Sequence, residues 1–176
     1  EGYDQIIVVD DGSQDKTAEV ARSKDATVVV HEVNSGLGAA LRTGLNEARS
    51  RGAETVVTFD ADGQHDPTDI GKLVEALEEA DFAVGERRRN QMPLNKKIGN
   101  FALDFLTHVL GGPFTDSQSG FRAFGKKALE KIRIRSDRYS VSSEIVIQVG
   151  EEELKFNPVP IRCIFTDYSK ASGTTI

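Results

Sequence analysis

The chain has 176 residues, of which 38% are hydrophobic and 28% are charged, and its formal net charge is −6. This length fits one domain with a substantial core. The acidic balance excludes a general nucleic-acid binder, which needs a basic face. Cys163 is the one cysteine, so an internal disulfide is excluded and a cytoplasmic location is expected. No apolar run reaches the length of a membrane span.

The first half of the chain alternates between strand and helix patterns. Short apolar segments rich in β-branched residues predict strands over residues 5–9, 27–31, 54–59 and 81–85. Helices are expected near residues 15–24, 37–51 and 68–80. This alternation is typical of an α/β fold with a doubly wound, mainly parallel sheet flanked by helices.

The second half is less regular. A polar loop is predicted over residues 86–91, and a long helix over residues 93–110 whose apolar face we interpret as core, with a lipid groove as the weaker alternative. A strand near 119–124 and helices near 126–132 and 140–149 follow. Pro158 and Pro160 interrupt a last apolar stretch, which predicts an edge strand or two short pieces.

Two carboxylates follow the third predicted strand. Asp60 and Asp62 are spaced i, i+2, so their side chains face the same way if the extended geometry persists. Hard oxygen donors of this kind suit Mg²⁺ or Mn²⁺, which in turn hold substrate phosphates. The sequence therefore predicts a divalent metal site, with a solvated acidic turn as the structural alternative.

A second acidic pair follows the first predicted strand. Asp10 and Asp11 come directly after an apolar run, and such strands are typically buried on both faces. Open α/β sheets bind ligands at the carboxyl ends of their strands, so we expect both acidic pairs on one rim. Gly36 and Gly38 open the next helix, where we favour close packing over a phosphate cradle.

Four motifs occur in order along the chain: Val-Val-Asp-Asp-Gly-Ser at 8–13, Asn-Ser-Gly-Leu-Gly-Ala-Ala-Leu-Arg-Thr-Gly at 34–44, Asp-Ala-Asp-Gly-Gln-His at 60–65 and Asp-Ser-Gln-Ser-Gly-Phe-Arg at 116–122. Together they resemble the inverting family-2 glycosyltransferases with the GT-A fold, in the dolichyl-phosphate mannosyltransferase or polyprenyl-phosphate glycosyltransferase branch. The resemblance implies one catalytic domain over residues 1–176, with a nucleotide-sugar half (1–85) and an acceptor half (86–176). The family's usual first strand–helix unit does not precede residue 8, so we expect an N-terminally truncated domain.

The resemblance also implies roles on the donor side. Gln64 joins Asp60 and Asp62 as a third ligand of the Mg²⁺ or Mn²⁺ that bridges the diphosphate of a GDP- or UDP-sugar. His65 is expected near that diphosphate, while His31 and His108 are interpreted as structural. The nucleoside side is assigned to Val8, Asp10 and Asp11.

On the acceptor side, the resemblance assigns the acceptor phosphate to Arg88, Lys97 and Arg122. Asp116 is counted with the catalytic carboxylates, as an orienting group first and a base second, because a phosphomonoester with a second pKa of about 6 barely needs deprotonation. Arg87 and Arg89 are interpreted as part of a solvated surface.

The expected activity is inverting transfer of a sugar, mannose or glucose, from the nucleotide sugar to a polyprenyl or dolichyl phosphate. Peripheral contact with the cytoplasmic face of a membrane is compatible with this activity. We expect no nucleic-acid partner. The alternatives are a hydroxyl acceptor on a protein or glycan, a non-catalytic nucleotide-binding or scaffold domain, and a phospho-receiver domain, which leaves the second half unexplained. A processive polysaccharide synthase is disfavoured because the chain has no tryptophan.

Overall fold

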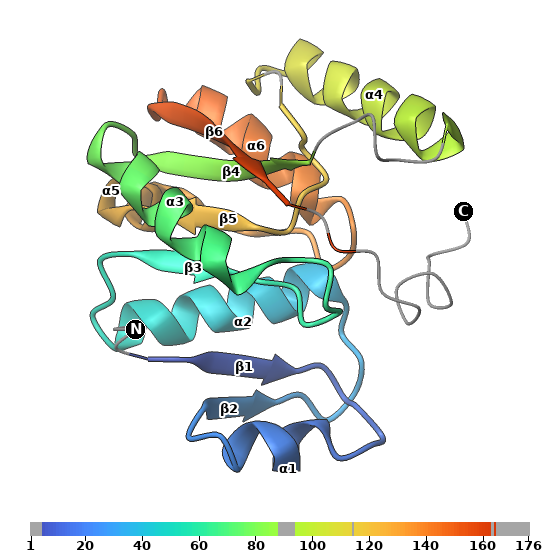
Figure 1. Cartoon of the computed structure of the whole chain (residues 1–176), viewed down its shortest axis with the longest axis vertical. Coiled ribbons are helices and arrows are strands. Elements are labelled where there is room, and N and C mark those ends of the chain that lie inside the picture. The colour runs from blue at the N-terminus through green and yellow to red at the C-terminus, as the bar shows by residue number, and fades with distance from the viewer. Residues whose placement is uncertain (1–4, 88–93, 114, 163, 165–176) are drawn as a thin grey trace.

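The computed structural model describes residues 5–87, 94–113, 115–162 and 164, with only the backbone described for residues 94–100. Two sheets organise this part of the chain, a two-stranded sheet of order β1-β2 and a four-stranded sheet of order β3-β5-β4-β6 (Figure 1). The strands are β1 (Ile7–Asp10), β2 (Thr27–Val30), β3 (Val56–Thr58), β4 (Phe82–Arg87), β5 (Arg122–Phe124) and β6 (Phe156–Ile161).

The helices flank both sheets, and α2 packs against both β1 and β3 (Figure 1). The predicted helix over residues 68–80 is a short α-helix with a 3₁₀ turn at each end, η1 (Pro67–Asp69) and η2 (Ala76–Glu78). The α-helices are α1 (Thr17–Arg22), α2 (Leu37–Ser50), α3 (Ile70–Glu75), α4 (Leu94–Val109), α5 (Lys126–Lys131) and α6 (Val141–Glu151).

The strand pairing is mixed. β1 pairs with β2 and β4 with β6 in parallel, whereas β5 lies between β3 and β4 and runs antiparallel to both. The predicted α/β architecture is confirmed, but the sequence pattern gave no indication that β5 reverses direction. β1 is only half-buried, because within the described residues it pairs with β2 alone.

The core lies on both faces of the four-stranded sheet. Phe82 and Val84 point to the face covered by α5 and α6, whereas Ala83 between them packs with Leu73 of α3 on the other. β6 closes one edge of the sheet and holds both of its prolines there, which confirms the edge-strand prediction. Proline has no N–H to donate, so an edge strand accommodates it.

The interpretation of the long helix α4 as core is wrong for its described side chains. Phe101, Phe105 and Val109 are 51%, 55% and 63% exposed, and the buried side chains of the helix are the polar Asp104 and Thr107. Figure 1 places α4 at the periphery of the molecule. Within the described residues, no helix has both the length and the apolar character needed to cross a membrane.

Candidate active site

A small open pocket of about 60 Å³ forms where the turn after β3 meets the end of β4 and the segment before β5. The pocket brings together the three predicted metal ligands and His65 with Arg87, which we had interpreted as solvated, and with two residues that had no predicted role. It is lined by Asp60, Asp62, Gln64, His65, Arg87, Gln118 and Gly120.

Asp60 is held at the pocket by His65, whose Nε2 lies 3.3 Å from Asp60 Oδ2. The His65 ring packs against the rings of Phe59 and Phe121, with centroids 5.7 and 4.9 Å away, which fixes its orientation. The hydrogen bond from His65 lowers the pKa of the Asp60 carboxyl below its usual value, against the opposing effect of burial. Asp60 is therefore an anion at neutral pH.

Gly120 lies directly behind the Asp60 carboxylate. A Cβ atom at this glycine would be 2.1 Å from Asp60 Oδ2, closer than any side chain allows. The Gly120 carbonyl accepts a hydrogen bond of 2.7 Å from Thr58 Oγ1, which ties the segment to β3. Glycine is thus required here for close approach of backbone to carboxylate.

Asp62 and Gln64 form the turn beyond Asp60. The Gln64 backbone N–H donates to Asp62 Oδ1 at 2.9 Å, and Gln64 Nε2 lies 2.5 Å from Asp62 Oδ2. Within the described ranges, no three or more His, Cys, Asp or Glu side chains gather as metal ligands. Two carboxylates and one amide oxygen nevertheless fit Mg²⁺ or Mn²⁺, which complete their coordination with water and substrate phosphates.

Arg87 is the main site residue that the sequence interpretation missed. It is not part of a solvated surface: it ends β4, lines the pocket and pairs with Asp116 through Nε–Oδ2 and Nη2–Oδ1 contacts of 2.7 Å each. The predicted strand ends at residue 85, whereas β4 extends to Arg87, so the sequence carried no signal for this position. Asp116 is buried, and both of its oxygens accept from Arg87.

The other predicted acceptor-side residues lie elsewhere. Arg88 and the side chain of Lys97 lie outside the described residues. Arg122 is fully buried beneath the pocket, where its Nη2 donates to the Ser117 carbonyl at 3.0 Å. Its predicted contact with the acceptor phosphate remains a prediction.

The acidic pair after β1 does not line the pocket. Val8 lies inside β1 opposite Val28, and Asp10 is buried with its Oδ1 accepting from the Ser13 N–H at 2.8 Å. In Figure 1 the ends of β1 and β2 and the turn after β3 lie on the same side of the molecule. The expected nucleoside role of Val8 and Asp10 stays a prediction.

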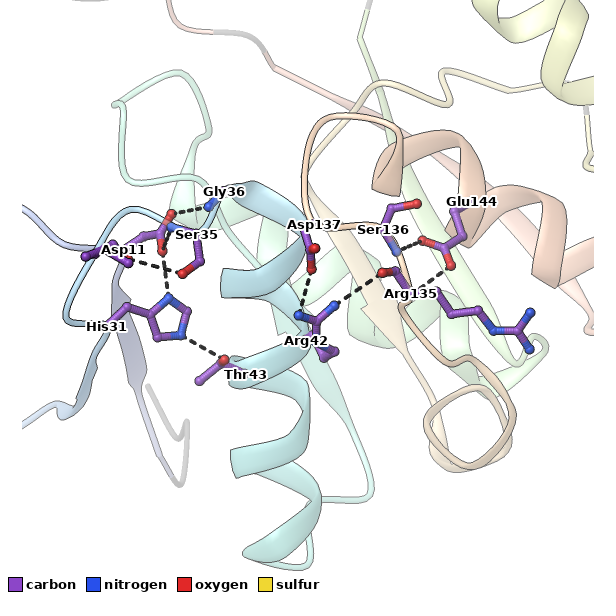
Figure 2. Close-up of polar contacts among 11 residues, drawn as sticks. Asp11, His31, Ser35, Gly36, Arg42, Thr43, Arg135, Ser136, Asp137 and Glu144 are labelled. Carbon is purple, nitrogen blue, oxygen red and sulfur yellow. Dashed lines mark hydrogen bonds and ion pairs between the residues drawn. The ribbon is translucent and has the colours of Figure 1, made fainter.

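Asp11 joins β1, β2 and the start of α2 (Figure 2). Its carboxylate accepts from the backbone N–H groups of Ser35 and Gly36 at 2.9 and 2.7 Å and lies 2.6 Å from His31 Nδ1. The other His31 nitrogen lies 2.9 Å from Thr43 Oγ1 of α2. Partial burial raises the pKa of Asp11, but the hydrogen bonds from Ser35, His31 and Gly36 outweigh it, so the pKa lies below its usual value.

The backbone N–H groups at the start of α2 donate to other parts of the protein. The N–H groups of Gly38 and Ala39 donate to the Asp137 carbonyl at 2.8 and 3.2 Å. A Cβ atom at Gly38 would be 2.0 Å from the Ser136 carbonyl oxygen. The packing interpretation of Gly36 and Gly38 is confirmed, since these N–H groups are not available as a phosphate cradle.

We expect Asp11→Asn to destabilise the fold by about 1–2 kcal/mol near pH 7, because it removes a charged acceptor for two N–H groups and His31. A depressed carboxyl pKa contributes stability above the unfolded value, and this contribution disappears as the pH falls through the folded value. Denaturant melts should therefore show the difference between variant and wild type shrinking below about pH 4. Asp25→Asn, at an exposed left-handed position that asparagine tolerates, is the control.

This fold, with an acidic pocket at a strand end and a paired arginine beside it, agrees with the GT-A class that the sequence motifs predict. The sequence matches Glycosyl transferase family 2 over residues 2–133. The chain belongs to this family and resembles its polyprenyl-phosphate glycosyltransferases.

Of three similar curated relatives, two are named as enzymes of this branch. An uncharacterised protein of Methanocaldococcus jannaschii is 48% identical, over 100% of this chain and 76% of the relative. A UDP-N-acetylglucosamine–dolichyl-phosphate N-acetylglucosaminyltransferase of Methanococcus voltae is 41% identical, over 99% of this chain and 80% of the relative. A polyprenol monophosphomannose synthase of Mycolicibacterium smegmatis is 31% identical, over 97% of this chain and 71% of the relative.

Solved structures confirm the GT-A-like fold class. Glucosyl-3-phosphoglycerate synthase from Mycobacterium tuberculosis with Mg²⁺ and uridine diphosphate superposes with a TM-score of 0.72 at 23% identity, over 93% of this chain and 61% of that chain. The same enzyme with Mn²⁺ and UDP-glucose gives a TM-score of 0.71 at 23% identity, with the same coverage. The chain thus spans about three-fifths of the solved structures that it matches.

Proposed function

We propose that this domain transfers a sugar from a nucleotide diphosphate sugar to a polyprenyl phosphate, with inversion at the anomeric carbon. The observation that carries the proposal is the pocket that two carboxylates and an arginine line together. A site for a divalent cation and a site for a second anion then lie side by side, as transfer between two phosphate-bearing substrates requires. The relatives named for dolichyl and polyprenol phosphate support this acceptor class.

On the donor side, Asp60, Asp62 and Gln64 would hold Mg²⁺ or Mn²⁺. The ion would stabilise the charge that develops on the leaving nucleoside diphosphate. His65 keeps the Asp60 carboxylate aimed at the pocket, and its own ring is held by the aromatic residues around it. Complexes of the structurally similar synthase with Mg²⁺ or Mn²⁺ and uridine nucleotides support this assignment.

On the acceptor side, Arg87 is the described cation that lines the pocket. A guanidinium offers two parallel donors to a phosphate and matches its geometry. Arg88 and Lys97 remain proposed contributors. Because the phosphate is itself anionic, the site needs to orient it rather than deprotonate it, which fits a carboxylate at Asp116 that is engaged with Arg87.

The expected result of the direct assay is transfer of labelled sugar to undecaprenyl phosphate in the presence of Mn²⁺, with no transfer after EDTA and recovery when Mn²⁺ is restored. Mannose or glucose remains the proposed sugar, and UDP-N-acetylglucosamine joins UDP-glucose and GDP-mannose in the donor panel because of the relative at 41% identity. Transfer to alcohol acceptors in preference to the lipid phosphate, or turnover that ignores the chelator, would contradict the proposal.

Peripheral contact with a membrane through α4 follows from the same proposal. Phe105 and Val109 belong to the exposed apolar face, while the buried Asp104 on the helix accepts 2.9 and 2.8 Å hydrogen bonds from Ser117 N and Oγ, next to Asp116. The buried side of α4 therefore packs against the segment that carries Asp116, while the apolar face on the other side of the helix is exposed. An interfacial helix buries its apolar face at the headgroup boundary, where the lipid phosphate would be presented.

Vesicle sedimentation tests this contact. Phe105→Ser should weaken binding to phosphatidylcholine–phosphatidylglycerol vesicles by about tenfold, since one phenylalanine side chain no longer enters the interface. Tyr139→Ser, at an aromatic residue that is 68% exposed and does not belong to α4, is the matched control. Equal binding by the Phe105 variant and the wild type would contradict a role of α4 at the membrane.

A further inference from the structure

Arg122 has the largest fully buried side chain of the described structure, yet only part of its guanidinium group is hydrogen-bonded. Nη2 donates to the Ser117 carbonyl at 3.0 Å, while Nε and Nη1 have no hydrogen-bond partner among the described residues. Buried donors without partners are rare in folded proteins. Each one loses its hydrogen bonds to water and gains none in the protein, which costs free energy. These two N–H groups therefore call for a partner that arrives in another state of the site.

The charges around Arg122 narrow the choice of partner. Burial lowers the pKa of Arg122 to about 10, whereas the negative charges of Asp60 and Asp116 raise it and Arg87 lowers it. The guanidinium is therefore still charged at neutral pH. Because its side chain has no exposed surface, a partner already inside the protein reaches it more readily than a substrate does.

Asp116 is the carboxylate that must move if Arg87 is to bind a phosphate. Its two oxygens are engaged by Arg87, so while this pair persists Arg87 cannot offer its paired donors to a phosphate. The next residue, Ser117, already accepts a hydrogen bond from Arg122, and the negative charge of Asp116 acts on this guanidinium. Displacing Asp116 without a new partner would leave an uncompensated buried charge, which is strongly destabilising.

We propose a partner exchange: when the acceptor phosphate binds Arg87, the Asp116 carboxylate turns to an unpaired N–H of Arg122. This inference rests on the proposed function, because it needs a phosphate in the pocket. Asp116 then has a cationic partner before and after the exchange, and Arg122 gains an acceptor that it lacks beforehand. Arg122 is in this scheme a positioning residue that receives Asp116, and it does not touch the phosphate.

The test is a binding titration with farnesyl phosphate followed by ³¹P NMR, which requires no turnover. Arg122→Gln should weaken binding by about tenfold or more, because Asp116 then has no second partner and competes for Arg87. Asp116→Asn removes the competing charge. In the Asp116→Asn background, the Arg122→Gln change should therefore alter binding by less than about twofold.

Each outcome of the binding titration either supports or overturns the partner exchange. Weakening by the same factor in both backgrounds would mean that Arg122 contacts the phosphate or acts only through the fold, and would overturn the exchange. No weakening in the wild-type background would overturn it as well. If Arg122→Gln does not fold, Arg122→Met, which also removes the charge and the donors, carries the same comparison. A wild-type chain that binds no farnesyl phosphate would overturn the proposed acceptor together with the exchange, which separates the two failures.

Discussion

Asp60→Asn is expected to reduce sugar transfer by about a thousandfold or more, because a bound divalent ion supplies several kcal/mol of charge stabilisation at the leaving diphosphate. The substitution removes the negative charge of the Asp60 carboxylate, which the contact with His65 keeps ionised, and leaves the size of the side chain unchanged. Asp62→Asn should act in the same direction. The measurement is steady-state transfer at saturating donor and lipid phosphate, with Mn²⁺ varied.

The control for this experiment removes one negative charge elsewhere. Glu54→Gln breaks an exposed ion pair with Lys126, and neither residue lines the pocket. Its effect on transfer should be small, since exposed ion pairs contribute little. An Asp60→Asn enzyme that retains more than about a tenth of wild-type turnover with an unchanged Mn²⁺ requirement would show that the ion binds elsewhere.

Gly120→Ala is expected to abolish most of the activity while leaving the fold intact. The three atoms nearest to the added methyl group all belong to the Asp60 carboxylate, at 2.1 to 2.7 Å, so this half-exposed side chain would have to turn away from its contact with His65. Turning the carboxylate out of the pocket should lower both the affinity for Mn²⁺ and transfer by about a hundredfold, since displacing a reactive group by an ångström costs that much.

The matched control is Gly71→Ala in α3, where an added Cβ has no atom within 4 Å. Alanine is the better helix former, so this variant should be as active as wild type and more stable by about 0.5–1 kcal/mol. Calorimetric Mn²⁺ titration in the presence of UDP, together with thermal melts, separates the two variants. Normal Mn²⁺ affinity in Gly120→Ala would argue that Asp60 is not a ligand.

The motif at 60–65 was predictable because its residues act close together in the chain. The apolar strand before Asp60 and the i, i+2 spacing to Asp62 place both carboxylates at one strand end, and the structure brings both into the pocket with Gln64. The nucleoside role of Asp11 was implied by the resemblance and stays a prediction. The hydrogen bonds that join its two oxygens to His31 and the start of α2 form a long-range network that no local pattern encodes.

The acceptor side was harder to predict, because its geometry depends on tertiary contacts. A run of arginines is normally solvated, and only the observed end of β4 places Arg87 beside Asp116. Periodicity also identifies the apolar face of α4 without telling what covers it, so burial was predicted where Phe105 is exposed. The three-residue strand that ends at Phe124 is too short for its direction to be read from the sequence.

The most direct measurement is the anomalous difference density of a crystal of this chain grown with Mn²⁺ and UDP. A manganese peak should lie between the carboxylates of Asp60 and Asp62, in contact with diphosphate oxygens. A structure with UDP bound but no manganese between these two side chains, or with the ion held by other residues, would contradict the assignment of this pocket as the catalytic metal site.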